Sequence, residues 1–219
     1  MDDTERFRAA ATGAAAAGTL SPTEAREVHG LAVAAGIGTV VLVEGVSDRV
    51  AVEMLAERLC RDLSAEGACV LDMGGAMSIR RYLQVLAGNG SELRLAGLCD
   101  ANEAPFFRRG LEEAGYGRDL DDDAMTALGF HVCTLDLEDE LIRCLGVGTV
   151  CEVIASAGHA RKLRTFQDQP AQRDRTVAQQ LRRFMGTTSG RKEQYARLLI
   201  ERLDLAHIPA PLSRLLAAL

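Results

Sequence analysis

Acidic residues follow several short apolar segments of this sequence, each at the point where the segment ends. The apolar segments are 39–43, 68–71, 93–99 and 130–134. The acidic residues behind them are Glu44 and Asp48, Asp72, Asp100 and Glu103, and Asp136, Glu138, Asp139 and Glu140. Carboxylates that gather in one place repel one another, and a divalent cation bound among them removes that cost. Because all of these side chains offer oxygen, the pattern predicts binding of magnesium or manganese.

A purely structural role is the alternative for each acid. Glu44, Asp48 and Asp100 could cap the helices that follow them. Residues 136–140 could begin a helix whose dipole favours negative charge, and the two glycines after the second segment could form an ordinary turn. Taken singly, the structural and functional roles have equal weight. Apart from the second segment with its glycine turn, the repetition of such acids at the other three of the four segment ends favours a functional site.

The pattern of apolar residues also predicts the elements that position these acids. Helical patterns separate the four strand-length segments; they cover 48–61, 77–86, 105–114 and 122–128. Strands that alternate with helices form a mainly parallel sheet covered on both faces. In such a sheet the ligand-binding groups gather at the carboxyl ends of the strands. We therefore expect an α/β fold in which the acids meet at one edge of a four-stranded sheet.

Both ends of the chain have helical patterns. Residues 1–35 predict two helices broken at Gly18–Pro22, with Ser21 as N-cap and Pro22 at the first helical position. After Leu137 the pattern is almost entirely helical. Within it we expect a loop at 167–175, helices at 178–184 and 191–204, and a short last helix framed by Pro209 and Pro211. The expected organisation is a helical N-terminal extension over 1–36, the α/β domain over 37–145 and a helical C-terminal region over 146–219.

The net charge of −6 is unevenly distributed. Residues 161–197 contain ten Lys/Arg and three acids, a balance of +7, which leaves −13 for the rest of the chain. A basic segment on an acidic body could hold phosphate at one place and metal at another. For most of the ten cations, a solvated helix face is the alternative.

Composition argues against several classes of protein. The six Cys form no CxxC pair, which is typical of a reducing cytosol, and the four His lack the spacing of a zinc site. The chain opens without the basic residues of a signal peptide, and its longest nearly apolar run, 31–43, is too short to span a bilayer. We expect a cytoplasmic protein without membrane contact. Aromatic residues make up 4%, which argues against serial base stacking along a single strand.

The strand-Glu-Gly-x-x-Asp pattern, the Gly-Gly turn and the strand-Asp-x-Asp pattern together resemble the Toprim signature. Toprim domains are shared by topoisomerases, bacterial primases and the overcoming-lysogenization-defect (OLD) nucleases. The segment VLVEGVSD at 41–48 resembles the OLD branch most. DLEDEL at 136–141 is similar to the acidic LE motif of that branch, and SGRKEQYA at 189–196 to its late helix with a lysine. The resemblance spans roughly 39–203 and implies a Toprim (Rossmann-like) fold.

The resemblance implies phosphodiester hydrolysis with two divalent ions. One ion would be held by Glu44 and Asp48 with Asp100 shared or adjacent, and the other by Glu138 with help from Asp136 or Glu140. The residues implied to bind metal are Glu44, Asp48, Asp100, Asn102, Asp136, Glu138 and Glu140. Lys192 would supply a positive charge to the developing anion, with a solvent-exposed helix residue as the alternative. The residues implied to meet phosphate are Gly45, Gly74, Gly75 and Arg191.

This sequence departs from the family pattern at two places. The Asp-x-Asp motif reads Asp100-Ala101-Asn102, which removes one negative charge and would weaken the second metal site. No GxxxxGK[ST] motif is present, so any ATPase would be a separate partner. We expect a magnesium- or manganese-dependent nuclease that acts on DNA more readily than RNA.

Other functions remain open from the sequence. One alternative is a metal- and nucleic-acid-binding module without turnover, which Asn102 favours. Another is an enzyme that hydrolyses or transfers a nucleotide phosphate. A Rossmann-like domain with a different ligand is the remaining one, although no GxGxxG follows the first strand, which argues against a dinucleotide.

Overall fold

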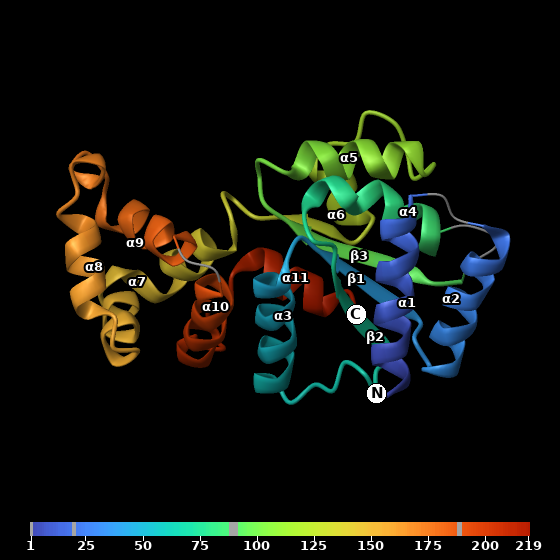
Figure 1. The fold of residues 1–219 in the computed structure, drawn as a ribbon, viewed down its shortest axis with the longest axis horizontal. Helices are drawn as coiled ribbons and strands as arrows, with labels where there is room; N and C mark the ends of the chain where they lie inside the picture. Colours follow the sequence, from blue (N-terminus) through green and yellow to red (C-terminus); the bar gives the residue numbers. More distant parts are fainter. Residues whose placement is uncertain (1, 19–20, 88–91, 188–189) are drawn as a thin grey trace.

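A four-stranded parallel sheet lies at the centre of the structure, a computed structural model that describes residues 2–18, 21–87, 92–187 and 190–219 (Figure 1). Its strands are β1 (Thr39–Val43), β2 (Ala68–Asp72), β3 (Arg94–Cys99) and β4 (Phe130–Val132). They lie in the order β2-β1-β3-β4 and every neighbouring pair is parallel. All five residues of β1 are buried, as expected for a central strand covered on both faces. The predicted α/β class and the parallel sheet are confirmed.

Helices connect the strands and extend both ends of the chain. Before and between the strands lie α1 (Asp3–Ala17), α2 (Pro22–Ala34), α3 (Val46–Arg58), the 3-10 turn η1 (Ala76–Ser78), α4 (Ile79–Leu86), α5 (Ala104–Glu113) and α6 (Asp122–Ala127). After β4 lie α7 (Leu137–Ser156), α8 (Ala160–Gln167), the 3-10 turn η2 (Pro170–Gln172), α9 (Val177–Gly186), α10 (Arg191–Arg202) and α11 (Ala210–Ala217). Among the described helices none is long and apolar enough to cross a bilayer.

The predicted break between the first two helices is confirmed at its described end. Ser21 accepts a hydrogen bond from the Glu24 amide, and the Glu24 side chain accepts one from the Ser21 amide, which makes a capping box. Thr19 and Leu20 of the predicted break lie outside the described residues. The separate helix α8 was not predicted, and one turn of 3-10 helix forms inside the predicted loop.

β4 is shorter than the predicted segment 130–134. Cys133 still donates its amide to the carbonyl of Cys99 (2.8 Å), but Thr134 donates its amide to the Glu140 carboxylate (2.7 Å). The chain therefore leaves the sheet because a side chain of the following helix takes over the hydrogen bond. This contact places the start of α7 directly beside the end of β4.

A hydrophobic cluster lies on each face of the sheet. Helices α3, α7, α8, α9, α10 and α11 contribute to one cluster, and α1, α2, α4, α5 and α6 to the other. Helix α7 is interrupted at Gly146, whose φ of 77° and ψ of 151° are not helical. Beyond this residue α7 leads into α8 and α9, which lie at one end of the molecule in Figure 1. Helices α10 and α11 return to pack against α3 and the sheet.

Candidate functional site

Lateral hydrogen bonds join the segments that leave the four strands. On the β2 side, the amides of Met73 and Gly75 donate to the carbonyls of Val43 (2.9 Å) and Glu44 (2.8 Å). On the β3 side, the Asp100 amide donates to the Glu44 carboxylate (2.8 Å). Next to it, the Ala101 amide donates to the carbonyl of Leu135 (2.9 Å). The four strand exits therefore meet, and the acids that follow them share one edge of the sheet.

Glu44 is the residue that links β1 to β3. Its carboxylate accepts the hydrogen bond from Asp100, so it does not act as the cap of α3. Burial raises the pKa of Glu44, and the nearby Glu103 and Glu138 carboxylates raise it further. The Asp100 amide and the Lys192 ammonium oppose this shift without cancelling it. Glu44 therefore lies where negative charge is already concentrated.

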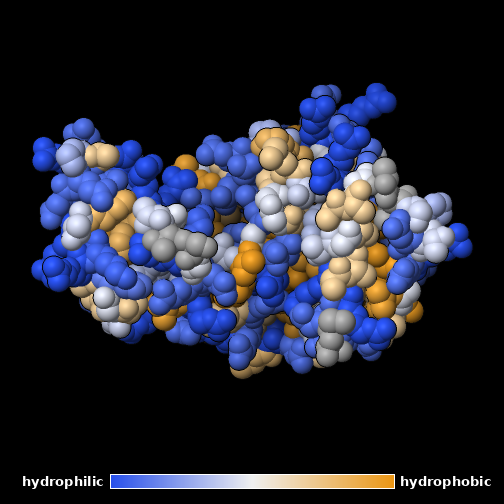
Figure 2. All heavy atoms as spheres, viewed as in Figure 1, coloured by the Kyte–Doolittle hydropathy of each residue, from blue (hydrophilic) through white to orange (hydrophobic). Residues whose placement is uncertain are grey.

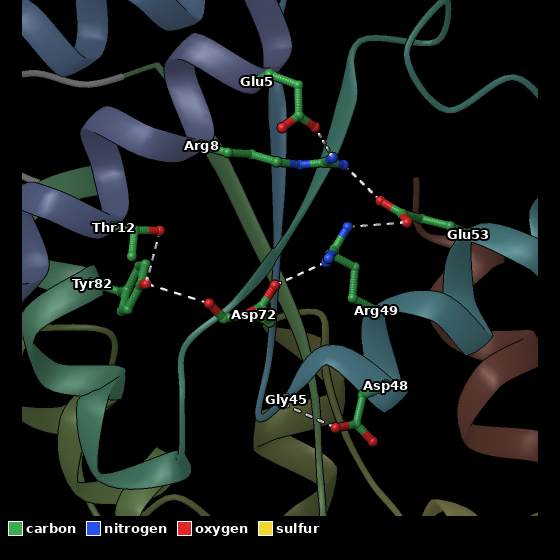
Figure 3. Close-up of polar contacts among 9 residues, drawn as sticks. All are labelled: Glu5, Arg8, Thr12, Gly45, Asp48, Arg49, Glu53, Asp72 and Tyr82. Atoms are coloured by element: carbon green, nitrogen blue, oxygen red, sulfur yellow. Dashed lines mark hydrogen bonds and ion pairs between the residues drawn. The ribbon is translucent and has the colours of Figure 1, made fainter. Parts of the chain in front are cut away.

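Asp48 lies one turn into α3 and has a structural contact of its own. Its carboxylate accepts a hydrogen bond from the amide of Gly45 (3.0 Å), so the capping role is present (Figure 3). Burial raises the pKa of Asp48 to about 7, with further contributions from the negative charges of Glu138 and Glu44. A capping acid on a helix surface would not experience this repulsion. Asp48 therefore caps its helix and also faces the other carboxylates.

Asp100, at the end of β3, is under the same repulsion. Burial raises the pKa of its carboxyl to about 8, and the charges of Glu44, Asp48, Asp136 and Glu138 add to the effect. The exit of β1 and the start of α7 thus direct negative charge toward one residue at the end of β3. This is the electrostatic situation that a bound cation would relieve.

The acids at the start of α7 have different partners. Asp136 caps the helix by accepting from the Asp139 amide (2.8 Å) and pairs with Arg182 of α9. Glu140 accepts from Thr134 and pairs with Arg143 (2.6 Å). The structural role is thus present for both residues. Glu138 is buried and is the one of the three that bears on Asp48.

Lys192 reaches this group from α10. Its ammonium lies 3.2 Å from the Glu138 carboxylate, and its side chain remains 49% exposed. Burial by itself lowers the pKa of Lys192, but the carboxylates of Glu138, Asp100 and Asp48 raise it overall. The lysine is therefore charged and turned toward the carboxylates. Ser189, at the start of the matching motif, lies outside the described residues.

The carboxylates suit a hard cation chemically but are engaged elsewhere in this structure. Within the described ranges, no three or more His, Cys, Asp or Glu side chains are arranged to hold a metal ion. The reason is visible in their contacts: Glu44 holds the Asp100 amide, Asp48 the Gly45 amide, and Glu138 the Lys192 ammonium. All the donors are oxygens, which is the ligand set that magnesium and manganese favour.

The other residues predicted for the site, an asparagine, two glycines and an arginine, have fewer contacts with the carboxylates. Asn102 is exposed in the turn after Asp100. Gly74 and Gly75 have φ of +68° and +123°, and a side chain at either would meet no atom within 4 Å, so the turn leaves open space beside Glu44. Arg191 lies over the Phe184 ring (4.5 Å) and donates to Thr187 (2.8 Å), so it is held against α9.

Sequence reasoning missed a set of ion pairs beside Asp48. Arg49 donates to Asp72 (2.8 Å) and lies 3.5 Å from Glu53, and Glu53 in turn pairs with Arg8 of α1 (2.6 Å). Figure 3 shows this series of contacts running from α1 through α3 to the end of β2. The i, i+4 spacing of Arg49 and Glu53 was a signal in the sequence. The contact with Arg8 had none.

Comparison with known proteins agrees with this geometry. Residues 38–101 match the model of the family described as "Overcoming lysogenization defect protein-like, TOPRIM domain". The chain carries an OLD-like Toprim domain. The match covers β1, β2 and β3 and includes Glu44, Asp48 and Asp100. The resemblance noted in the sequence is therefore confirmed. No curated protein is similar enough in sequence to give a significant match.

Solved structures extend the similarity beyond the Toprim domain. The C-terminal region of the Burkholderia pseudomallei OLD protein aligns with a TM-score of 0.64 and 20% identity, over 83% of this chain and 96% of that one. The C-terminal region of the Xanthomonas campestris pv. campestris OLD protein aligns with a TM-score of 0.62 and 24% identity, over 83% and 91%. At this identity the likeness establishes the fold, including helices after the sheet.

Proposed function

We propose that this protein is a divalent-metal-dependent nuclease that hydrolyses phosphodiester bonds, DNA in preference to RNA. The observation that carries the proposal is the convergence of Glu44, Asp48, Asp100 and Glu138, with Lys192 beside them, at the strand exits of a Toprim domain. The mutual repulsion of these carboxylates is costly unless a cation or a similar positive group balances it. A structural role for each acid alone does not account for their common location.

The residues have separable roles in this proposal. Glu44, Asp48 and Asp100 would hold one magnesium or manganese ion, and Glu138 would contribute to a second. When bound, two such ions activate a water and neutralise the leaving oxygen. Lys192 would exchange its contact with Glu138 for a phosphate oxygen and stabilise the added charge. The open Gly74-Gly75 turn would let the strand approach without a steric clash.

Metal-dependent nicking of supercoiled plasmid by the purified protein tests this proposal. We expect cleavage in magnesium or manganese, none in chelator, and at least a 100-fold loss of rate in Glu44→Ala, about the effect of losing one group that stabilises the transition state. Asp123→Ala, which removes an exposed acid of α6, is the matched control and should keep the wild-type rate. Wild-type cleavage by Glu44→Ala would contradict the proposal, since a contaminant would then be responsible.

A second function is favoured by two specific observations. Asn102 replaces the second acid of the Asp-x-Asp motif, and Lys192 already neutralises Glu138. Both would suit a Toprim module that binds metal and nucleic acid, and works with a separate ATPase, without cutting. This alternative predicts DNA binding that weakens as salt rises, with no turnover in either metal. Robust cleavage would eliminate it.

A further inference from the structure

An exposed apolar side chain follows each of the four strands whose ends carry the carboxylates. Among the described residues, the large hydrophobic side chains that are exposed are Val33, Val46, Met77, Phe106, Leu135 and Val177. Four of the six follow the four strands, one each: Val46 after β1, Met77 after β2, Phe106 after β3 and Leu135 after β4. Single exposed apolar residues are ordinary on protein surfaces. The placement of one at every strand exit is not a scattered arrangement. We call these four residues the apolar rim.

Backbone contacts hold the apolar rim next to the carboxylates. The Gly75 amide bonds the carbonyl of Glu44 (2.8 Å), which fixes the turn that leads to Met77. The carbonyl of Leu135 accepts from the amide of Ala101, the residue after Asp100 (2.9 Å). The turn η1, which carries Met77, packs against α5, which carries Phe106. The rim is therefore continuous with the candidate site.

The two largest rim side chains project into solvent although their neighbours are buried. Met77 is 76% exposed, whereas Ala76 before it is 4% exposed. Two glycines with positive φ, Gly74 and Gly75, precede this turn of the chain. Phe106 is 42% exposed, whereas Phe107 is fully buried in the core. Neither side chain contributes its full area to the fold.

We infer that the apolar rim receives the bases on either side of the phosphate held at the carboxylates, so that the substrate is a single-stranded or locally opened segment of nucleic acid. This inference rests on the proposed function. In a nucleic acid, the apolar group next to a phosphate is the base, and a paired base is hidden in its stack. Methionine and phenylalanine are among the side chains that proteins insert between neighbouring bases, which partly unstacks them. Only the bases beside one phosphate are involved, which is compatible with the low aromatic content.

Binding of the full chain to a fluorescent oligonucleotide tests the inference. The measurement compares a single strand with the duplex of the same sequence, in calcium, which takes the same oxygen ligands as magnesium. Wild type should bind the single strand more tightly. Met77→Ser and Phe106→Ser should each weaken single-strand binding by about 5- to 100-fold, the value of one base contact, and leave duplex binding unchanged. Val33→Ser, which removes an exposed apolar side chain of α2, should match wild type.

Photocrosslinking gives a readout that does not depend on affinity. A single strand that carries 5-iodouracil should crosslink, on irradiation, to peptides that contain Met77 or Phe106. Crosslinks confined to other peptides, or unchanged binding in both serine variants, would overturn the inference. If cleavage still depends on Glu44 in that case, the proposed function stands. Absence of both oligonucleotide binding and cleavage would contradict the inference and the proposed function alike. A lower oligomeric state in the serine variants than in wild type, with oligonucleotide binding unchanged, would overturn the inference and assign the rim to an interface between copies.

Discussion

Asp100 illustrates, at the scale of one residue, the conflict between stability and a charged site. Its carboxyl is partly buried among other acids, and its pKa is raised to about 8 by burial and by their charges. A neutral side chain of the same shape would remove the repulsion. The charge of Asp100 is therefore expected to lower the free energy of unfolding when no cation is present. A bound cation is expected to remove this loss.

Asp100→Asn should consequently melt at a higher temperature than wild type in chelator. Each kcal/mol of relieved repulsion corresponds to about 2–4 °C for a chain of this size. Addition of magnesium should raise the melting temperature of wild type by mass action and raise that of the variant less. Scanning calorimetry with and without chelator measures both effects, and Asp123→Asn is the control. A variant that melts below wild type in chelator would contradict this account of the carboxylate cluster.

At the scale of an element, β3 depends on a glycine inside the sheet. A Cβ on Gly97 would lie 2.6 Å from the Phe130 ring and 2.9 Å from the backbone carbonyl of Leu42. The ring of Phe130 on β4 thus occupies the space above the strand. Gly30, in the middle of α2, is the opposite case because a Cβ there would meet no atom within 4 Å.

Alanine at these two positions should therefore change the free energy of unfolding in opposite directions. Gly97→Ala should lower the free energy of unfolding by about 1–3 kcal/mol, since the sheet must shift to admit the methyl group. Gly30→Ala should raise it by about 0.5–1 kcal/mol, because alanine is favoured within a helix. Urea unfolding monitored by circular dichroism measures both changes. Equal effects of the two substitutions would show that the close contact at Gly97 is absent.

At the scale of the whole molecule, charge is separated between the sheet edge and the helices α8 and α9. This end of the molecule, at the left of Figure 2, is covered largely by hydrophilic side chains. Arg161, Lys162 and Arg191 line a shallow cavity of about 450 Å³ there, together with Phe166 and Phe184. In the described part of the chain, none of the three cations forms an ion pair with a carboxylate. Arg161 and Lys162 can therefore contact phosphate, whereas Arg191 is held by Thr187 and the Phe184 ring.

Lys162→Ala should therefore weaken DNA binding uniformly across sequences and reduce the slope of log affinity against log salt by about 1. Arg26→Ala removes one positive charge from α2 and should leave the slope unchanged. Fluorescence anisotropy over a range of salt concentrations gives both slopes. An equal decrease in the two variants would indicate that net charge, rather than this surface, determines binding.

The sheet and its acids could be predicted because they depend on local sequence. Each residue of Thr39–Val43 is apolar or β-branched, so its identity as a buried strand and the place of Glu44 at its end follow from pattern alone. The parallel topology then brings Glu44 and Asp100 together without further information. Capping by Ser21 was equally local.

Contacts between residues far apart in the chain could not be predicted in this way. Lys192 was assigned to the site by a weak motif match, but its pairing with Glu138 depends on how α10 packs beside α7. The departure from helical geometry at Gly146 is likewise not predicted by the helical pattern of the sequence. The exposure of Met77 and Phe106 could not be predicted, because both fit the pattern of ordinary core residues within their own helical segments. Exposure is a property of the whole fold.

The ion pairs from Arg8 through Glu53 and Arg49 to Asp72 connect α1 to α3 and to the end of β2, next to Asp48. A fragment cut at the first strand would keep the carboxylates of the candidate site yet leave Glu53 without Arg8, the nearer of its two arginine partners. Tyr82, which donates to both Thr12 and Asp72, would also lose a partner. We therefore expect loss of the opening helix to lower the stability of this edge of the sheet, because α1 supports α3 and, through it, the end of β2.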